Sequence, residues 1–186
     1  RDRLTGEGFL EAQTMAFAPA GEGEVEVANP VSTQEPFLRT RLLPGLFRRV
    51  EHNFARGGRD VRLFELGSVF SRRDGIEAPR EEAHLGLVVT GRERPIHWGR
   101  DSHDVDLWYL KGLLERLIPI LRREGLTLKN GGPSGEGLVS GEGYTVVDPQ
   151  GHTVGFGGRV KSSLLDAPAW AAPVWGLELN LPSEPS

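Results

Sequence analysis

The stretch from Asn29 to Phe70, NPVSTQEPFLRTRLLPGLFRRVEHNFARGGRDVRLFELGSVF, decides the fold of this chain. Pro44 lies where the first turn of a helix tolerates proline, and Gly57-Gly58 lie where a helix end favours left-handed backbone. Between these signals, apolar residues recur at three- and four-residue steps, at Leu43, Leu46, Phe47, Val50 and Phe54. The stretch therefore predicts an amphipathic helix from Leu43 to Arg56 that must bury one stripe.

The residues after this helix predict two long strands of a sheet that is covered on both faces. From Val61 to Phe70, apolar side chains occur at positions that point to either face, as in a central strand. A turn signal follows at Arg72 to Gly75, and His84 to Thr90 is a second apolar strand. Upstream, the alternation from Glu11 to Phe17 indicates a strand, and Val31 to Thr40 indicates a loop.

A second helix is predicted from Val105, with its N-terminus capped by Asp101, Ser102 or Asp104. Its apolar positions are Leu107, Leu110, Leu114, Leu117, Ile118 and Leu121. Pro119 predicts a kink or break, because a proline inside a helix costs ~3 kcal/mol. We expect an α+β fold in which an antiparallel β-sheet is flanked by helices, with both long helices against one face of the sheet.

The C-terminal third has the texture of strands joined by turns. Asp148-Pro149-Gln150-Gly151 is typical of a type I turn, so Tyr144 to Val147 and His152 to Phe156 are expected to pair as a hairpin. Val174 to Leu181 alternates as a closing strand. We expect one domain over residues 1–182 and a loose tail over residues 183–186.

Composition limits the classes of protein to which the chain can belong. A chain of 186 residues can bury about 70% of its unfolded surface in a single domain. The formal charge of −4 provides no general attraction for phosphates, and the absence of cysteine excludes disulfides and thiolate metal sites. No apolar run approaches the length that spans a bilayer. We expect a soluble, cytoplasmic protein, and its first residue and loose end suggest a fragment of a longer chain.

Several short motifs, in this order and spacing, resemble the beta subunit of bacterial phenylalanyl-tRNA synthetase. They are Asn29-Pro30-Val31-Ser32, Leu38-Arg39-Thr40, Leu42-Leu43-Pro44-Gly45-Leu46, Asn53-x-Ala55-Arg56-Gly57, Val61-Arg62-Leu63-Phe64-Glu65-Leu66-Gly67-x-Val69-Phe70 and Asp106-Leu107-x-x-Leu110-Lys111-Gly112. The resemblance implies a class II synthetase-like core without catalytic residues. It also implies that this module docks on the catalytic alpha subunit and adjoins other beta-subunit domains, without contact with a membrane.

The resemblance also implies where the chemistry of the enzyme takes place. The assembled enzyme uses ATP and magnesium to attach phenylalanine to its tRNA, while this module carries no cofactor and meets tRNA only through the assembly. The strand Ala83-His84-Leu85-Gly86-Leu87 carries aliphatic residues where a catalytic relative would resemble Phe-His-Gln, and Gly176 to Leu181 lacks the arginine that would face ATP in such a relative. We therefore predict no catalytic residues here. The alternative is a free-standing class II synthetase-like binding protein or ligase with its own substrate.

Other polar clusters are interpreted as structural. His97, Asp101, His103, Asp104 and Asp106 match no helical two-histidine pattern, so they are read as a solvated loop with a helix cap rather than a metal site. The glycines from Gly155 to Gly158 lack the Lys-Ser/Thr of a phosphate-binding loop and are read as hairpin glycines.

The region proposed to meet the alpha subunit is the start of the first long helix. Arg39 and Arg41 either face a partner or cover apolar neighbours with their stems. With the resemblance, we predict a subunit interface made by Arg39, Thr40, Arg41, Leu42, Leu43, Leu46, Phe47 and Val50. Because the apolar stripe of this helix is larger than its own sheet is expected to cover, part of the stripe should be exposed in the isolated chain or hidden by self-association.

Overall fold

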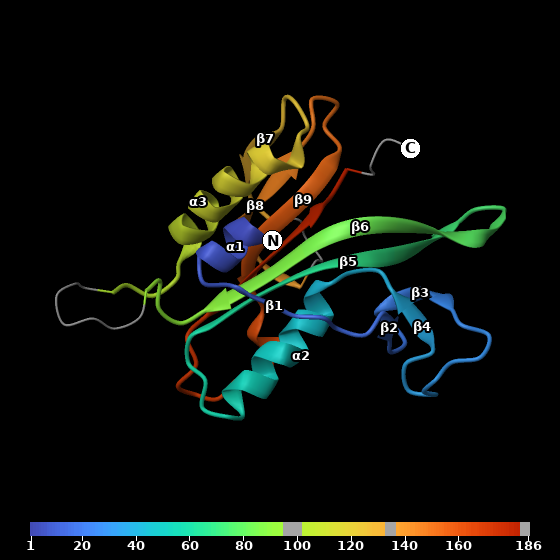
Figure 1. The fold of residues 1–186 in the computed structure, drawn as a ribbon, viewed down its shortest axis with the longest axis horizontal. Coiled ribbons are helices and arrows are strands. Elements are labelled where there is room, and N and C mark those ends of the chain that lie inside the picture. The colour runs from blue at the N-terminus through green and yellow to red at the C-terminus, as the bar shows by residue number, and fades with distance from the viewer. Residues whose placement is uncertain (95–101, 133–136, 183–186) are drawn as a thin grey trace.

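A computed structural model describes residues 1–94, 102–132 and 137–182 of the chain, and their strands form two sheets (Figure 1). The large sheet has the strand order β1-β5-β6-β10-β9-β8-β7, and the small sheet has the order β2-β4-β3. The strands are β1 Leu10–Glu11, β2 Phe17–Ala18, β3 Gly23–Glu26, β4 Phe37–Arg39, β5 Val61–Arg73, β6 Ile76–Thr90, β7 Thr127–Asn130, β8 Leu138–Val147, β9 Thr153–Val160 and β10 Val174–Asn180. The helices are α1 Asp2–Gly6, α2 Leu43–Phe54 and α3 Leu107–Leu117, with 3-10 turns η1 Ile118–Leu121 and η2 Ser162–Leu164.

The large sheet is built on the β5–β6 hairpin and on β10, which lies between β6 and β9. Leu63 faces Val88 across the hairpin, and Leu177 faces Leu87 on one side and Gly157 on the other. Within the described residues, the pairing of β1 with β5 is parallel and the other strand pairs are antiparallel. The expected α+β fold with a mainly antiparallel sheet is therefore confirmed.

The two long helices cover opposite faces of the large sheet, which corrects the expectation that both lie on one face (Figure 1). Phe64 and Leu87 pack on the side of α3, whereas their neighbours Leu63 and Val88 pack on the side of α2. The helices take opposite faces because β5 has apolar side chains on both faces, and both must be covered from water.

Three expected elements differ in the structure. The region from Glu11 to Phe17 is not one strand, because β1 ends at Glu11 and β2 begins at Phe17. The expected loop over residues 31–40 contains β4, which pairs with β2 and β3. The cap of α3 is Asp106, whose Oδ1 accepts from the amide of Tyr109 at 2.8 Å, rather than one of the earlier polar residues.

Other local predictions are confirmed. The α-helix ends before Pro119 and continues as the 3-10 turn η1, and Gly57 takes the left-handed backbone (φ +79°) expected after α2. Val147 pairs with Thr153 around the turn at Asp148. The expected tail over residues 183–186 lies outside the described residues.

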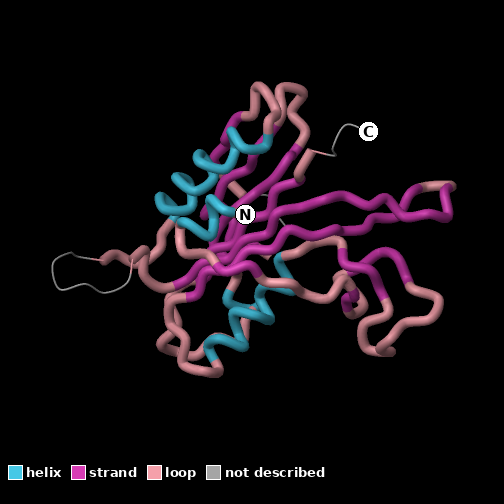
Figure 2. The backbone as a smooth tube through the Cα atoms, viewed as in Figure 1, coloured by secondary structure: helices cyan, strands magenta, loops and turns pink. Residues whose placement is uncertain are grey.

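The β5–β6 hairpin is longer than the sheet around it. Its distal half extends beyond the body of the molecule, as the tube in Figure 2 shows. The hairpin turns at Gly75, which has φ +72°. The small sheet lies along the same hairpin, where the backbone amide of Arg72 donates to Glu24 at 3.1 Å. No helix in the described ranges combines the length and apolar character that crossing a membrane requires.

Candidate functional site

A row of glycines in the large sheet lets the segment that leads into α2 lie directly on the strands. A Cβ atom added to Gly86 would lie 2.7 Å from the Cβ of Leu42, and one added to Gly67 would lie 2.4 Å from Nη2 of Arg39. On β10, a Cβ added to Gly176 would lie 3.2 Å from Leu43. The close approach of Arg39–Leu43 to the sheet therefore depends on the absence of side chains at these positions.

Two buried glutamates flank this contact on the same sheet face. Glu65 on β5 and Glu178 on β10 are the strand partners of Gly86 on either side, and their exposed fractions are 2% and 1%. Because Leu42 lies over Gly86 and is itself fully buried, the two carboxylates lie to either side of an apolar side chain. Buried carboxylates require partners, and the chain provides them from two different segments.

Arg39 neutralises Glu65 in a buried network. Nη1 of Arg39 donates to Oε1 of Glu65 at 2.8 Å and to Oγ1 of Thr14 at 2.8 Å, and Nε donates to the carbonyl of Ser68 at 2.9 Å. Thr14 in turn donates to the second oxygen of Glu65 at 2.7 Å. The guanidinium is therefore held by contacts within its own chain, as a buried ion pair requires.

Glu178 holds the N-terminus of α2 on the sheet. Its carboxylate accepts from the backbone amides of Leu42 and Leu43 at 3.1–3.2 Å, groups that have no partner within the helix. His84 Nδ1 lies 2.7 Å from the same carboxylate. Burial lowers the pKa of the neighbouring Arg41, whereas the charge of Glu178 raises it. This carboxylate thus acts as a helix cap supplied from a distant strand.

The expected exposure of the α2 stripe is wrong. Leu43, Leu46, Phe47, Val50 and Phe54 have exposed fractions of 2%, 0%, 6%, 0% and 3% and form a core cluster with residues of β5, β6, β8, β9 and β10. Arg39 and Leu42 are also buried, so within this chain six of the eight predicted interface residues serve the fold. Their assignment to a subunit interface stays a prediction, and Thr40 and Arg41 are the two that keep partial exposure.

Thr40 and Arg41 line a groove of ≈ 400 Å³ beside the start of α2. Pro44 and Phe47 form part of its floor, and Leu164, which is 47% exposed, contributes an apolar rim. The rim also carries the ion pair of Arg48 with Glu22 (3.0 Å). Contact to a partner at the predicted interface would therefore involve this groove rather than the apolar stripe itself.

The other predicted clusters separate in the structure. Asp106 caps α3, and Asp104 forms an isolated bridge with Arg92, whereas His97 and Asp101 lie outside the described residues. The described residues contain no group of three or more histidine, cysteine, aspartate or glutamate residues able to hold a metal ion. Trp108 on α3 is 71% exposed, and Nζ of Lys111 lies 5.8 Å from the centre of its ring.

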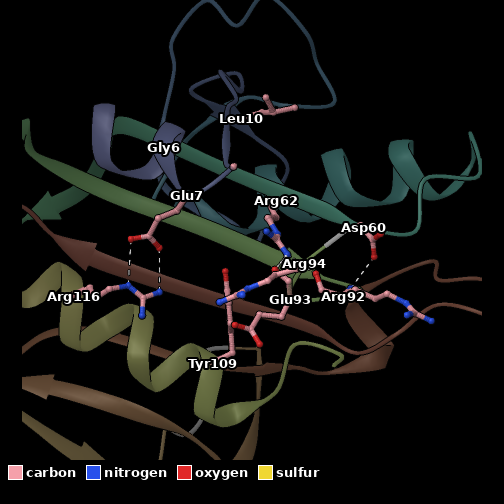
Figure 3. Close-up of a pocket in the computed structure, with 11 residues that line it drawn as sticks. Gly6, Glu7, Leu10, Asp60, Arg62, Arg92, Glu93, Arg94, Tyr109 and Arg116 are labelled. Carbon is pink, nitrogen blue, oxygen red and sulfur yellow. Dashed lines mark hydrogen bonds and ion pairs between the residues drawn. The ribbon is translucent and has the colours of Figure 1, made fainter. Parts of the chain in front are cut away.

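Sequence reasoning missed a second, larger pocket of ≈ 730 Å³ on the α3 side of the sheet (Figure 3). Its lining includes the arginines Arg62, Arg92, Arg94 and Arg116. These come from β5, from the segment after β6 and from α3, so they are spread over 54 residues of sequence between Arg62 and Arg116. No local motif marks such a pocket, because the sheet brings its parts together.

Comparison with known proteins gives a consistent result. The family described as "Phenylalanyl tRNA synthetase beta chain CLM domain" matches residues 1–181. A phenylalanine–tRNA ligase beta subunit from Oleidesulfovibrio alaskensis is 32% identical over 168 residues, covering 88% of this chain and 20% of its own length. The corresponding subunit from Nitratidesulfovibrio vulgaris is 30% identical over 167 residues, covering 87% of this chain and 20% of its own length.

The fold has a counterpart among solved structures. A pyrrolysyl tRNA synthetase from Desulfitobacterium hafniense superimposes with a TM-score of 0.66 at 15% sequence identity, over 96% of this chain and 60% of that one. At this identity the similarity concerns the fold alone, which is that of a class II synthetase core. This chain spans about a fifth of the length of the two curated relatives.

Proposed function

This chain belongs to the family of phenylalanyl tRNA synthetase beta chain CLM domains, and on that premise we propose that it is a noncatalytic docking module for the catalytic alpha subunit. In this proposal the assembled cytoplasmic enzyme uses ATP to attach phenylalanine to its tRNA. The module contributes a rigid surface to that assembly. Other beta-subunit domains adjoin it, and tRNA meets it only through the complex.

The observation that carries this proposal is that one face of the large sheet is covered by a segment of the same chain. The face that bears Glu65 and Glu178 is covered by α2 and by the segment that precedes it, at atomic contact with the glycine row. Both carboxylates and Arg39 are engaged in hydrogen bonds that hold this cover in place. A substrate would need converging polar groups that are open to it, and here these groups serve the fold.

ATP chemistry also requires charge to hold phosphates and a divalent cation. The described residues contain no group of three or more histidine, cysteine, aspartate or glutamate side chains that could hold such a cation, and Glu178 on β10 is engaged by the helix terminus. In the proposal, magnesium and ATP therefore act in the alpha subunit, and no catalytic step is assigned to residues of this chain.

The groove beside α2 is the proposed place of docking. It is lined by the apolar side chain of Leu164 and by the ion pair of Arg48 with Glu22. These side chains are partly exposed, whereas the apolar stripe of α2 is buried. Interfaces concentrate their binding energy in a few apolar or arginine anchors surrounded by polar contacts. The groove has that composition, and it is held by the rigid start of α2.

The alternative of a free-standing class II-like ligase makes a different prediction for the chain alone. Incubated with ATP, phenylalanine and labelled pyrophosphate, the chain is expected to give no exchange of label into ATP, because α2 and the segment before it cover the sheet face that bears Glu65 and Glu178 and leave no converging polar groups open there. The purified alpha–beta assembly serves as the positive control. Exchange by the chain alone that is lost in an Arg39→Met variant would overturn the noncatalytic assignment.

Replacing Leu164 with glutamate is expected to weaken binding of the cognate alpha subunit by about 2 kcal/mol or more, because a charge would enter a desolvated rim. Titration calorimetry measures the affinity, and thermal melting of the variant checks its fold. The matched control is Ile120→Glu, since Ile120 is 51% exposed and lies on η1, away from the groove. Equal affinity of both variants and the parent chain would remove this groove from the interface.

A further inference from the structure

The pocket in Figure 3 lies on the opposite side of the sheet from α2 and is independent of the proposed docking groove. It is bounded by the residues between α1 and β1, by the start of β5, by the segment after β6 and by α3. Its volume of ≈ 730 Å³ exceeds what a single small ion fills. Four arginines and three acidic residues line it, which leaves a formal excess of one positive charge.

Two of the three acidic residues are already engaged. Glu7 forms a two-pronged ion pair with Arg116, at 3.2 Å to Nε and 3.1 Å to Nη2, and Figure 3 shows these side chains pointing toward each other. Asp60 accepts from the backbone amide of Arg92 at 2.7 Å. The Glu7–Arg116 pair is neutral, so the net charge of +1 in the pocket comes from Arg62, Arg92 and Arg94 set against Asp60 and Glu93.

Arg62 is only partly satisfied. Its Nη2 donates to the carbonyls of Arg92 and Glu93, which orients the guanidinium, but its Nε is buried and finds no acceptor among the described residues. A buried donor without a partner is costly, so an incoming oxygen would gain more here than at the surface. Gly8 lies beside this guanidinium, since a Cβ added at Gly8 would be 3.8 Å from Nη1 of Arg62.

Two neighbours complete a set of donors. Arg94 is exposed, and no ion pair engages its side chain within the described part of the chain. Burial raises the pKa of Tyr109, the charges of Glu7 and Glu93 raise it further, and those of Arg62 and Arg116 oppose them. The phenol therefore keeps its proton at neutral pH and can donate.

We propose that this pocket binds a carboxylate carried by a peptide segment, with Arg62 and Arg94 as its charged donors. An arginine fork matches the planar geometry of a carboxylate. Leu10, 68% exposed on the lining, provides an apolar contact for a residue next to the carboxylate. A nucleic-acid backbone fits less well, because its successive phosphates would meet Glu93 as well as the arginines, and such binding needs a continuous basic surface.

The test is an NMR titration of the ¹⁵N-labelled chain with the blocked peptide acetyl-Leu-Glu-Leu-amide. Amide shifts are expected around Gly8, Arg62 and Arg94, and the Gln counterpart of the peptide is expected to bind about tenfold more weakly, since a charged hydrogen bond is lost. Arg94→Gln should weaken binding about tenfold by the same reasoning. Glu93→Gln should strengthen it, because it removes the one lining carboxylate that no hydrogen bond or ion pair engages among the described residues.

The matched control is Arg49→Gln, which makes the same change of charge at an exposed arginine on the far side of the sheet and should leave binding unchanged. Arg62→Gln tests the buried donor, with thermal melting to check folding, and the Arg94 and Glu93 variants decide the matter if it does not fold. Equal binding of the Glu and Gln peptides, or no shifts at the pocket, would overturn the proposal. Tighter binding of inorganic phosphate or of an RNA oligonucleotide than of the Glu peptide would overturn the peptide assignment.

Discussion

Replacing Arg39 with methionine is expected to lower the free energy of unfolding by about 3–5 kcal/mol, because Glu65 would be left buried without its partner. The two side chains are 9% and 3% exposed, and their atoms lie 2.8 Å apart, so solvent does little to screen the loss. Thr14 and the carbonyl of Ser68 would lose a donor in the same change. Urea unfolding followed by circular dichroism measures the difference.

The double variant Arg39→Met with Glu65→Met separates the ion pair from the packing. If the cost of the single change is an uncompensated carboxylate, removing that carboxylate should restore most of the stability. Arg49→Met is the surface control and should change stability by no more than about 0.5 kcal/mol. A single variant as stable as the parent chain, or a double variant no better than the single, would contradict the role assigned to this pair.

Replacing Gly86 with valine is expected to cost about 3 kcal/mol, although valine normally favours a strand. The reason is the 2.7 Å approach to the Cβ of Leu42, an atom that cannot move without the start of α2. Lifting that terminus would also stretch the contacts of Glu178 with the amides of Leu42 and Leu43. The loss is measured by thermal and urea unfolding.

Gly112→Ala provides the control of opposite sign. Gly112 lies inside α3, and an added Cβ would meet only Nη1 of Arg116 at 3.2 Å, the end of a flexible side chain. Alanine in a helix interior should therefore stabilise the chain by up to about 1 kcal/mol. If Gly86→Val were tolerated as well as this change, the segment over the glycine row would be less closely packed than the structure indicates.

Local features were predictable because they depend on neighbouring residues. Pro44 and Gly57 bracket α2, the turn after β5 follows from Asp74-Gly75, and Asp148 begins the turn between β8 and β9. These signals act through backbone preferences that need no tertiary partner. The motif order likewise identified the family, since its matching residues are spread through the same elements.

What the sequence by itself determined is that α2 has one apolar stripe and that β5 is apolar on both faces. Only the tertiary structure decided that α2 and α3 take opposite faces and that the stripe is buried within the chain. It alone joined Glu178 to the start of α2 and gathered the arginines of the second pocket. The physical reason is that the periodicity of apolar residues shows which side chains avoid water but not which segment covers them. The covering segment, and the partner of each buried charge, depend on the strand register between segments far apart in the chain.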